Sequence, residues 1–260
     1  MSTEKNMIRR GFLSQAIVGL GLLSLGGCSK IAATSWGRSI LHSVEALTRR
    51  AQRLFLSPSA LAPEFAESDL SPVFKANGTQ SPDDAHFQAL AANNFVDYRL
   101  EIDGLVERPA KLSLPELRAL PAREQITRHD CVEGWSCIGK WKGVKLGALL
   151  DSAGLKSNAR YVVFHCFDVL EKSPDGTGIY YESIDLVDAF HPQTILAYEM
   201  NGVTLPLAHG APLRLRLERQ LGYKMAKYIR RIEVVESFAG FGRGNGGFWE
   251  DRGYEWYAGI

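Results

Sequence analysis

The sequence predicts an α+β protein that is rich in strands and has a single main domain. Segments with the alternating or β-branched pattern of strands are interleaved with short helices that have start and stop signals. A strong hairpin signal, Asn201-Gly202, lies between the apolar runs 195–200 and 203–205. The 260 residues are 45% hydrophobic and 23% charged, which is typical of a globular protein and excludes wholesale disorder.

The charge balance excludes a nucleic-acid binder. Lys and Arg total 30 against 29 Asp and Glu, which gives a formal net charge of +1, whereas a nucleic-acid-binding protein has a clear basic excess or clustered basic residues. The four cysteines are too few for a disulfide scaffold at this length.

The first 28 residues are typical of an export signal, with a basic head before an uncharged apolar stretch at 11–27. Residues 8–13 (Ile-Arg-Arg-Gly-Phe-Leu) resemble a twin-arginine signal, which exports proteins already folded. Leu-Gly-Gly-Cys at 25–28 resembles a lipobox, in which Cys28 is lipidated; the alternative is a cleaved signal in which Cys28 is incidental. We therefore expect a periplasmic lipoprotein attached to the membrane, and folded export also favours a cofactor loaded before export.

Residues 29–84 are predicted to form an amphipathic helix and a linker. Apolar residues recur at steps of three and four between Ile40 and Leu54, among several arginines. Such a basic helix can lie on an anionic membrane surface or pack on the domain. Four prolines in 57–84 indicate a linker or a wrapping loop. The main domain is then 85–260.

Within the main domain, local signals predict each element in turn. Strands are expected at 98–102, 161–167, 195–200, 203–205, 213–217 and 229–235. Helices are expected at 114–120, after a capping box of Ser113 and Glu116, at 145–153 before Gly154, and at 183–190. The last twenty residues combine glycines with aromatic residues and indicate an ordered wrapping tail, because so much aromatic surface is unfavourable in water.

The densest group of chemically active side chains lies at 128–137, around Cys131. Cys131 could be a nucleophile activated by His129, half of a disulfide with Cys137 or Cys166, or a thiolate ligand of a soft redox metal. A zinc site is disfavoured because no Cys-x-x-Cys pair is present. That site would draw on His129, Cys131, Cys137, His165 and Cys166. The residues alone leave these alternatives open.

A second group, at 208–214 and 222–227, combines His209, Arg214 and Lys227 with turn residues. Backbone N–H groups and a guanidinium in such a turn suit a phosphate, although solvated basic residues on a hairpin are an equal alternative. The sequence has no Gly-x-Gly-x-x-Gly or Walker pattern for a nucleotide, no Cys-x-x-Cys-His for haem and no Gly-x-Ser-x-Gly elbow.

Together these motifs resemble the molybdopterin-binding domain of the sulfite oxidase family over residues 90–260. The resemblance is carried, in chain order, by Asn-Asn-Phe at 93–95, Cys-Val-Glu-Gly-Trp-Ser at 131–136, Asn-Gly at 201–202, His-Gly-Ala-Pro-Leu-Arg at 209–214 and Gly-Tyr-Lys-Met-Ala-Lys at 222–227. It is closer to the haem-free branch, which includes the catalytic subunit of periplasmic protein-methionine-sulfoxide reductase.

The resemblance implies a role for each matching residue. Cys131 would be the thiolate ligand of molybdenum, and Glu133 a catalytic carboxylate near the metal that moves protons. The remaining cofactor contacts would be Asn93, Cys166, His209, Arg214, Met225, Ala226 and Lys227. Two of these depart from the reductase pattern, since Cys166 replaces a threonine and His209 an asparagine. The departures bear on the substrate more than on the cofactor.

The resemblance also implies the mixed sulfite oxidase-type α+β fold and a molybdenum-molybdopterin oxidoreductase. Such an enzyme would move an oxygen atom to or from a small substrate or an oxidised side chain, sulfoxide-like or sulfite-like. Electrons would come from a separate protein, a membrane haem protein being one candidate. Because the chain ends at Ile260, we expect neither an immunoglobulin-like nor a haem domain.

Two other hypotheses compete with this one. A membrane-anchored binding lipoprotein could retain the fold without redox activity, which would agree with the altered positions Cys166 and His209. A thiol enzyme could instead use Cys131 and His129.

Overall fold

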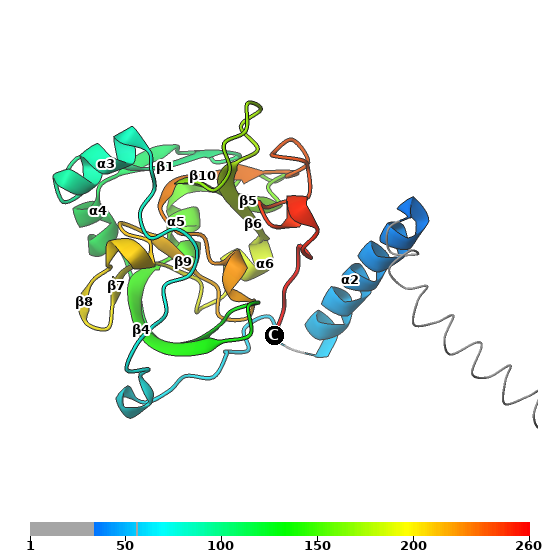
Figure 1. Cartoon of the computed structure of the whole chain (residues 1–260), viewed down its shortest axis with the longest axis horizontal. Coiled ribbons are helices and arrows are strands. Elements are labelled where there is room, and N and C mark those ends of the chain that lie inside the picture. The colour runs from blue at the N-terminus through cyan, green and yellow to red at the C-terminus, as the bar shows by residue number, and fades with distance from the viewer. Residues whose placement is uncertain (1–33, 56) are drawn as a thin grey trace, which may run out of the picture. The chain divides into compact units, whose positions relative to one another are not determined.

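The computed structural model describes residues 34–55 and 57–260 (Figure 1). The predicted export signal, including Cys28, lies outside the described residues. The chain forms two compact units, Met1–Leu54 and Phe55–Ile260. The amphipathic helix predicted before the linker is present as α2 (Ser35–Phe55). No helix in the described part of the chain is both long enough and apolar enough to cross a bilayer.

The second unit is built on two five-stranded sheets. The first has the order β2 (Ala110–Leu112), β1 (Leu100–Gly104), β10 (Ile229–Val235), β5 (Tyr161–Val169) and β6 (Ile179–Asp185). The second has the order β3 (Ala122–Asp130), β4 (Ser136–Lys145), β7 (Ile195–Met200) and β8 (Val203–Thr204), and β9 (Arg214–Arg216) also pairs with β7. Only β1 and β10 pair in parallel among these strands. The α+β prediction is confirmed.

Short helices and turns connect the strands. They are α3 (Ala85–Ala92), α4 (Leu114–Ala119), α5 (Leu146–Ala153), α6 (Leu186–Ala189) and the 3-10 turns η1 (Glu67–Asp69), η2 (Leu207–His209), η3 (Gly222–Lys224) and η4 (Glu250–Arg252). The predicted capping box opens α4, because the Ser113 hydroxyl accepts from the Glu116 N–H and the Glu116 carboxylate accepts from the Ser113 N–H. Gly154 ends α5 as expected.

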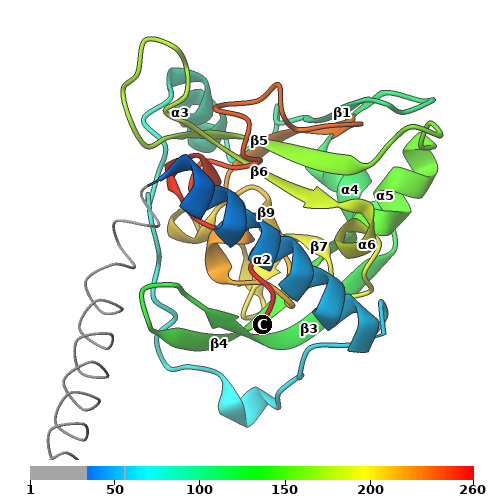
Figure 2. The same ribbon diagram turned by 90° about the vertical axis from the view of Figure 1, so that its right-hand side faces the viewer.

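The main hydrophobic core lies between the two sheets. It joins Phe164 and Ile232 of the first sheet to Leu196 and Leu215 of the second, and Leu149 of α5 belongs to the same cluster. Figure 2 shows the first sheet and the β3–β4 hairpin on opposite sides of this unit. Burial of this apolar surface is the main driving force for folding.

Several sequence predictions are confirmed. The β7–β8 hairpin turns at Asn201 (φ 50°) and Gly202 (φ 80°), the left-handed conformations that an Asn-Gly turn favours. Strand β10 has the predicted bounds. The C-terminal tail is ordered: Phe248 is buried, and the Leu221 N–H donates to the Ala258 carbonyl at 2.9 Å.

The prediction of a helix over 183–190 is wrong for its first part. Residues 183–185 complete strand β6, which pairs with β5 up to Asp185. The helix α6 starts only at Leu186, where the Asp185 side chain caps it by accepting from the Asp188 N–H. The sheet ladder overrides the local helical pattern.

The long β3–β4 hairpin is absent from the sequence predictions. On β3 the buried side chains are Gln125, Thr127 and His129, so the strand has no apolar alternation to reveal it. Gln125 and Thr127 have specific partners: Gln125 Nε2 donates to Glu218 Oε1 at 2.8 Å, and Arg216 Nη2 donates to Thr127 Oγ1 at 3.5 Å.

Residues 57–84 wrap over the second unit, whereas the sequence places the start of the main domain near residue 85. The Ala62 N–H donates to Gln193 Oε1 at 2.8 Å, and the Ser71 N–H donates to the Ile138 carbonyl at 3.1 Å. These hydrogen bonds, donated by backbone N–H groups of 57–84, hold the proline-rich segment in place as a wrapping loop.

Gly143 provides a test of the close packing of β4 on β7. A Cβ atom there would collide with the Leu196 carbonyl. We expect Gly143→Ala to lower the free energy of unfolding by about 1–3 kcal/mol, measured by urea unfolding. Gly240→Ala is the matched control, because a Cβ atom at that position would have no atom within 4 Å and no positive φ constrains the residue. Equal stability of the two variants would contradict the register given for β4 and β7.

Candidate functional site

One pocket collects residues from six separate parts of the chain. It encloses about 740 Å³ of empty space, a volume that includes its open mouth. Its lining comes from the wrapping loop, the β3–β4 turn, strands β5 and β6, the 222–227 motif and the C-terminal tail. The residues are Asn77, Gly78, Thr79, Cys131, Val132, Glu133, Asp168, Leu170, Tyr180, Gly222, Tyr223, Met225, Lys227, Trp249 and Tyr254.

Cys131 is the first residue after β3 and lies half-buried in this pocket. The turn is closed by its own backbone, because its N–H donates to the Trp135 carbonyl at 2.9 Å and its carbonyl accepts from the Gly134 N–H at 3.0 Å. Burial raises the pKa of the Cys131 thiol. A free thiol with a raised pKa is a poor nucleophile at neutral pH, and a bound metal ion would favour its thiolate.

The thiol-enzyme hypothesis also lacks a suitable base. His129 Nδ1 lies 3.3 Å from Met225 Sδ and 3.2 Å from Arg216 Nη1, and Nε2 has no hydrogen-bond partner among the described residues. Burial, and then the charge of Arg216, holds the pKa of His129 well below its usual range, so its imidazole is a weak base. Cys131, Cys137 and Cys166 are all free thiols. The disulfide alternative for Cys131 is therefore wrong for the described cysteines.

Glu133 supplies an exposed carboxylate to the same pocket. Its Oε2 accepts from Trp135 Nε1 at 2.8 Å and lies 3.6 Å from Lys75 Nζ. The hydrogen bond from Trp135, followed by the charge of Lys75, lowers the pKa of Glu133. Glu133 is therefore ionised at neutral pH and can accept a proton.

Arg214 of β9 is a buried cation with unused donors. Its Nη1 donates to the His209 carbonyl at 3.0 Å, but Nε and Nη2 have no hydrogen-bond partner among the described residues. Burial, and then the charge of Arg216, lowers the pKa of Arg214 to about 9, so the group stays charged at neutral pH. An unpaired buried charge is unfavourable, and an anionic group that accepts from Nε and Nη2 would remove that cost.

Lys227 and His209 adjoin Arg214. A Cβ atom on Gly210 would lie 2.9 Å from Lys227 Cβ and 3.2 Å from Arg214 Cβ, so only glycine allows this approach. Burial, and then the charge of Arg214, lowers the pKa of Lys227 to about 7 and that of His209 to about 4. His209 is therefore neutral at physiological pH.

Lys227 uses all three of its N–H donors on backbone carbonyls. Nζ donates to Asn77 at 2.7 Å, Thr79 at 2.5 Å and Ala208 at 3.1 Å. The lysine thereby ties the wrapping loop to the pocket wall.

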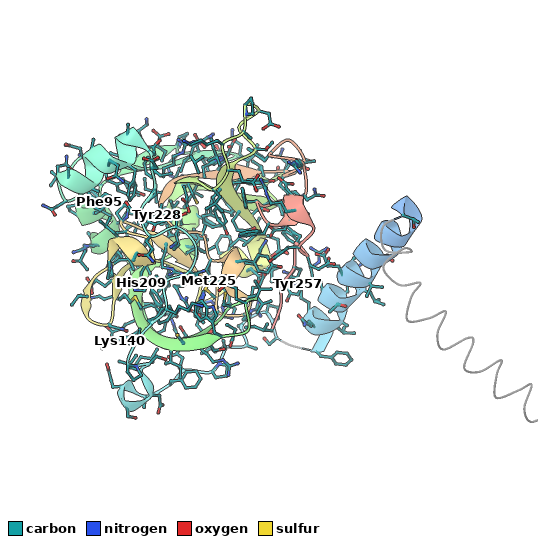
Figure 3. The ribbon with its side chains drawn as sticks, in the orientation of Figure 1. Phe95, Lys140, His209, Met225, Tyr228 and Tyr257 are labelled. Carbon is teal, nitrogen blue, oxygen red and sulfur yellow. The ribbon has the colours of Figure 1, made fainter. Side chains whose placement is uncertain are left out.

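Met225 and Ala226 continue the same motif. Both are buried, and Met225 lines the pocket toward the middle of the domain (Figure 3). The Ala226 carbonyl accepts from the Leu215 N–H at 2.8 Å, which fixes the motif beside β9 and hence beside Arg214.

The structure does not bring every predicted residue to the pocket lining. Cys131, Glu133, Met225 and Lys227 line it. His209, Arg214 and Ala226 are not part of the lining and lie beside Lys227. Cys166 is fully buried in the main core, where burial holds its pKa well above the usual range. It is placed as an inert core thiol.

Asn93 lies at the end of α3 and is not part of the described pocket lining. Its Nδ2 donates to Asp97 Oδ2 at 2.6 Å, while its buried Oδ1 has no partner among the described residues.

Asp168 is a pocket residue that the sequence predictions missed. It is buried, its Oδ1 has no partner among the described residues, and burial raises its pKa despite a hydrogen bond from the Thr79 side chain. A lone carboxylate in the apolar strand β5 was the available signal.

A metal in this pocket would need ligands from outside the protein. Among residues 34–55 and 57–260, no group of three or more His, Cys, Asp or Glu side chains is placed to hold a metal ion. Cys131 alone could contribute one ligand, and an organic chelate would have to contribute others.

Comparison with known proteins decides between the remaining hypotheses. Residues 86–239 match the family model for the oxidoreductase molybdopterin binding domain. The chain belongs to this family. It is a molybdenum-molybdopterin oxidoreductase, the resemblance to the sulfite oxidase family is confirmed, and the hypothesis of a binding lipoprotein without redox activity is not favoured.

Curated relatives extend the match. The putative protein-methionine-sulfoxide reductase subunit YedZ1 of Azospira oryzae is 38% identical over 96% of this chain and 87% of its own length. The protein-methionine-sulfoxide reductase catalytic subunit MsrP of Xanthomonas campestris is 38% identical over 54% of this chain and 45% of its own. The match thus spans about half the length of MsrP. Among solved structures, the sulfane dehydrogenase SoxCD of Paracoccus pantotrophus has a TM-score of 0.47 at 23% identity, over 55% of this chain and 39% of its own.

The lowered pKa of His209 predicts a pH dependence of stability. Between about pH 6.5 and about pH 4, protons bind the unfolded imidazole but not the folded one. The contribution to stability is therefore complete above about pH 6.5 and is lost as the pH falls toward 4. When the pH is lowered from about 7.5 to about 5, the free energy of unfolding should fall less in His209→Asn than in the parent. Urea unfolding at the two pH values measures both falls. An identical loss in both proteins would contradict this assignment.

Proposed function

We propose that the protein reduces sulfoxides, with Cys131 as the thiolate ligand of molybdenum and Arg214 as the residue that binds the phosphate of the pterin cofactor. The observation that carries the proposal is a pocket lined by Cys131 and Lys227, together with the buried guanidinium of Arg214 next to Lys227, whose Nε and Nη2 are unused. The names of two relatives support sulfoxides as the substrate class, since both proteins are named as protein-methionine-sulfoxide reductase subunits.

The residues present fit the cofactor. Arg214 has two free N–H directions for a phosphate, and bidentate contacts of this kind are strong. Met225 and Lys227 would flank the pterin, with Ala226 and His209 beside them and Asn93 as a further contact. Once bound, the molybdenum supplies two-electron oxygen-atom chemistry.

The chain's own residues handle protons and water. Reduction of a sulfoxide consumes two protons and two electrons and releases the thioether and one water molecule. Glu133 faces solvent, so its Oε atoms can accept a proton from hydronium or a buffer acid and pass it into the pocket, which returns Glu133 to the carboxylate form. The electrons would come from a separate redox protein, with a membrane haem protein as our proposed donor.

We propose a periplasmic location with a lipid attached at Cys28. The support is the twin-arginine pattern at 8–13 and the lipobox pattern at 25–28. Helix α2 follows directly, with Val44, Leu47 and Leu54 exposed among basic residues, a composition that suits an anionic membrane surface. Two attachments together hold a protein on a membrane better than one.

Metal content tests the role of Cys131. We expect the purified parent to contain molybdenum and to oxidise reduced viologen with methionine sulfoxide, and Cys131→Ser to lose activity and most of the metal because a serine hydroxyl is a poor ligand for a soft site. Cys137→Ser is the matched control, since Cys137 pairs with His129 in the same hairpin but does not line the pocket. Equal molybdenum in both serine variants would rule out the role of Cys131.

Fractionation tests the membrane attachment. We expect the full-length parent to sediment with membranes and Cys28→Ser to shift largely to the soluble periplasmic fraction, since one amphipathic helix alone binds weakly. Mass spectrometry of the mature N-terminus is the second measurement. An unmodified N-terminus in the parent would contradict lipidation.

A further inference from the structure

The C-terminal tail supplies an aromatic wall to the pocket. Trp249 and Tyr254 both line it, and their rings stack with centroids 5.3 Å apart. Tyr223 of the 222–227 motif meets Tyr254 edge-on at 5.1 Å. Trp249 and Tyr254 lie beyond the residues that match the family model, 86–239. Cys131 and Lys227 lie within the matched residues, so the pocket joins the two parts of the chain.

Buried polar contacts fix this wall to the cofactor motif. Lys224 Nζ donates to Glu182 Oε1 at 2.5 Å and to Glu250 Oε1 at 2.6 Å, and all three side chains are buried. Glu250 directly follows Trp249. The Tyr223 hydroxyl donates to the Glu255 carbonyl, next to Tyr254, at 2.6 Å. The wall is thus held on both sides, as a preorganised binding surface requires.

The pocket gives a small oxyanion few hydrogen-bond donors. The amine of Lys227 has no N–H left for a ligand, because all three donate to backbone carbonyls. The lining also includes the carboxyl groups of Glu133 and Asp168. A neutral, dipolar sulfoxide needs no bidentate cation to hold it, so this lining suits it better than an anion such as sulfite.

We infer that Trp249 and Tyr254 bind the S-methyl end of a methionine sulfoxide side chain carried on a flexible peptide. The inference rests on the proposed function and names two specificity-determining residues for it. The methyl group of the sulfoxide is still apolar, and aromatic rings offer it a large apolar surface. Tyr254 is 37% exposed, so the wall reaches the mouth of the pocket, where a peptide backbone can remain in solvent while the side chain enters.

The test compares variants of the full-length, molybdenum-loaded protein. Trp249→Ala and Tyr254→Ala should each raise KM for a short methionine-sulfoxide peptide about tenfold with little change in kcat, at unchanged molybdenum content. Trp249→Phe should restore much of the loss, because it keeps an aromatic ring. Trp256→Phe is the control, since Trp256 is a tail aromatic outside the pocket lining.

Fluorescence gives a readout independent of turnover. Titration with the same peptide should quench tryptophan emission in the parent and in Trp256→Phe, with much weaker binding in Tyr254→Ala. If the loaded parent reduces no sulfoxide, the proposed function fails and this inference with it. If the parent is active but both alanine variants keep the parental KM and peptide affinity, the inference alone is overturned.

Discussion

The buried guanidinium of Arg214 is the constraint around which we propose that the site is organised. Two neighbouring buried cations have carboxylate partners: Arg216 is bidentate to Glu218, and Lys224 lies between two glutamates. Among the described residues, Arg214 Nη1 donates to the His209 carbonyl and the guanidinium lies 4.9 Å from the Trp141 ring, while Nε and Nη2 have no partner. An anionic group from outside the chain would compensate this charge.

The strand topology explains how segments that are distant in the sequence meet around Arg214 and the pocket. Strand β9 pairs with β7 and presents Arg214, while the Leu215–Ala226 hydrogen bond aligns the 222–227 motif beside it. The β3–β4 turn brings Cys131 to the pocket that Met225 and Lys227 of this motif also line. The wrapping loop and the tail then complete the walls. The centre of the pocket therefore comes from the family domain, and its rim from segments on either side of that domain.

Much of this could be predicted from local chemistry. Asn201-Gly202, the Ser113 capping box and the apolar run of β10 indicate their elements because the signals are short-range. The 131–136 and 209–214 motifs indicated the thiol and the basic group. The β3–β4 hairpin could not be predicted, because its buried face is polar and is satisfied only by partners such as Glu218, 93 residues from Gln125. Asp168 and Trp249 join the site only through tertiary packing.

The most direct test of this account is the pterin content of Arg214→Leu, measured as the fluorescence of the oxidised pterin released from purified protein. The account predicts that the variant loses most of the pterin, yet that its cofactor-free form unfolds at a urea concentration no lower than the cofactor-free parent, because an uncompensated buried charge has been removed. A variant that retains the parental pterin content would contradict the assignment of Arg214 to the cofactor phosphate.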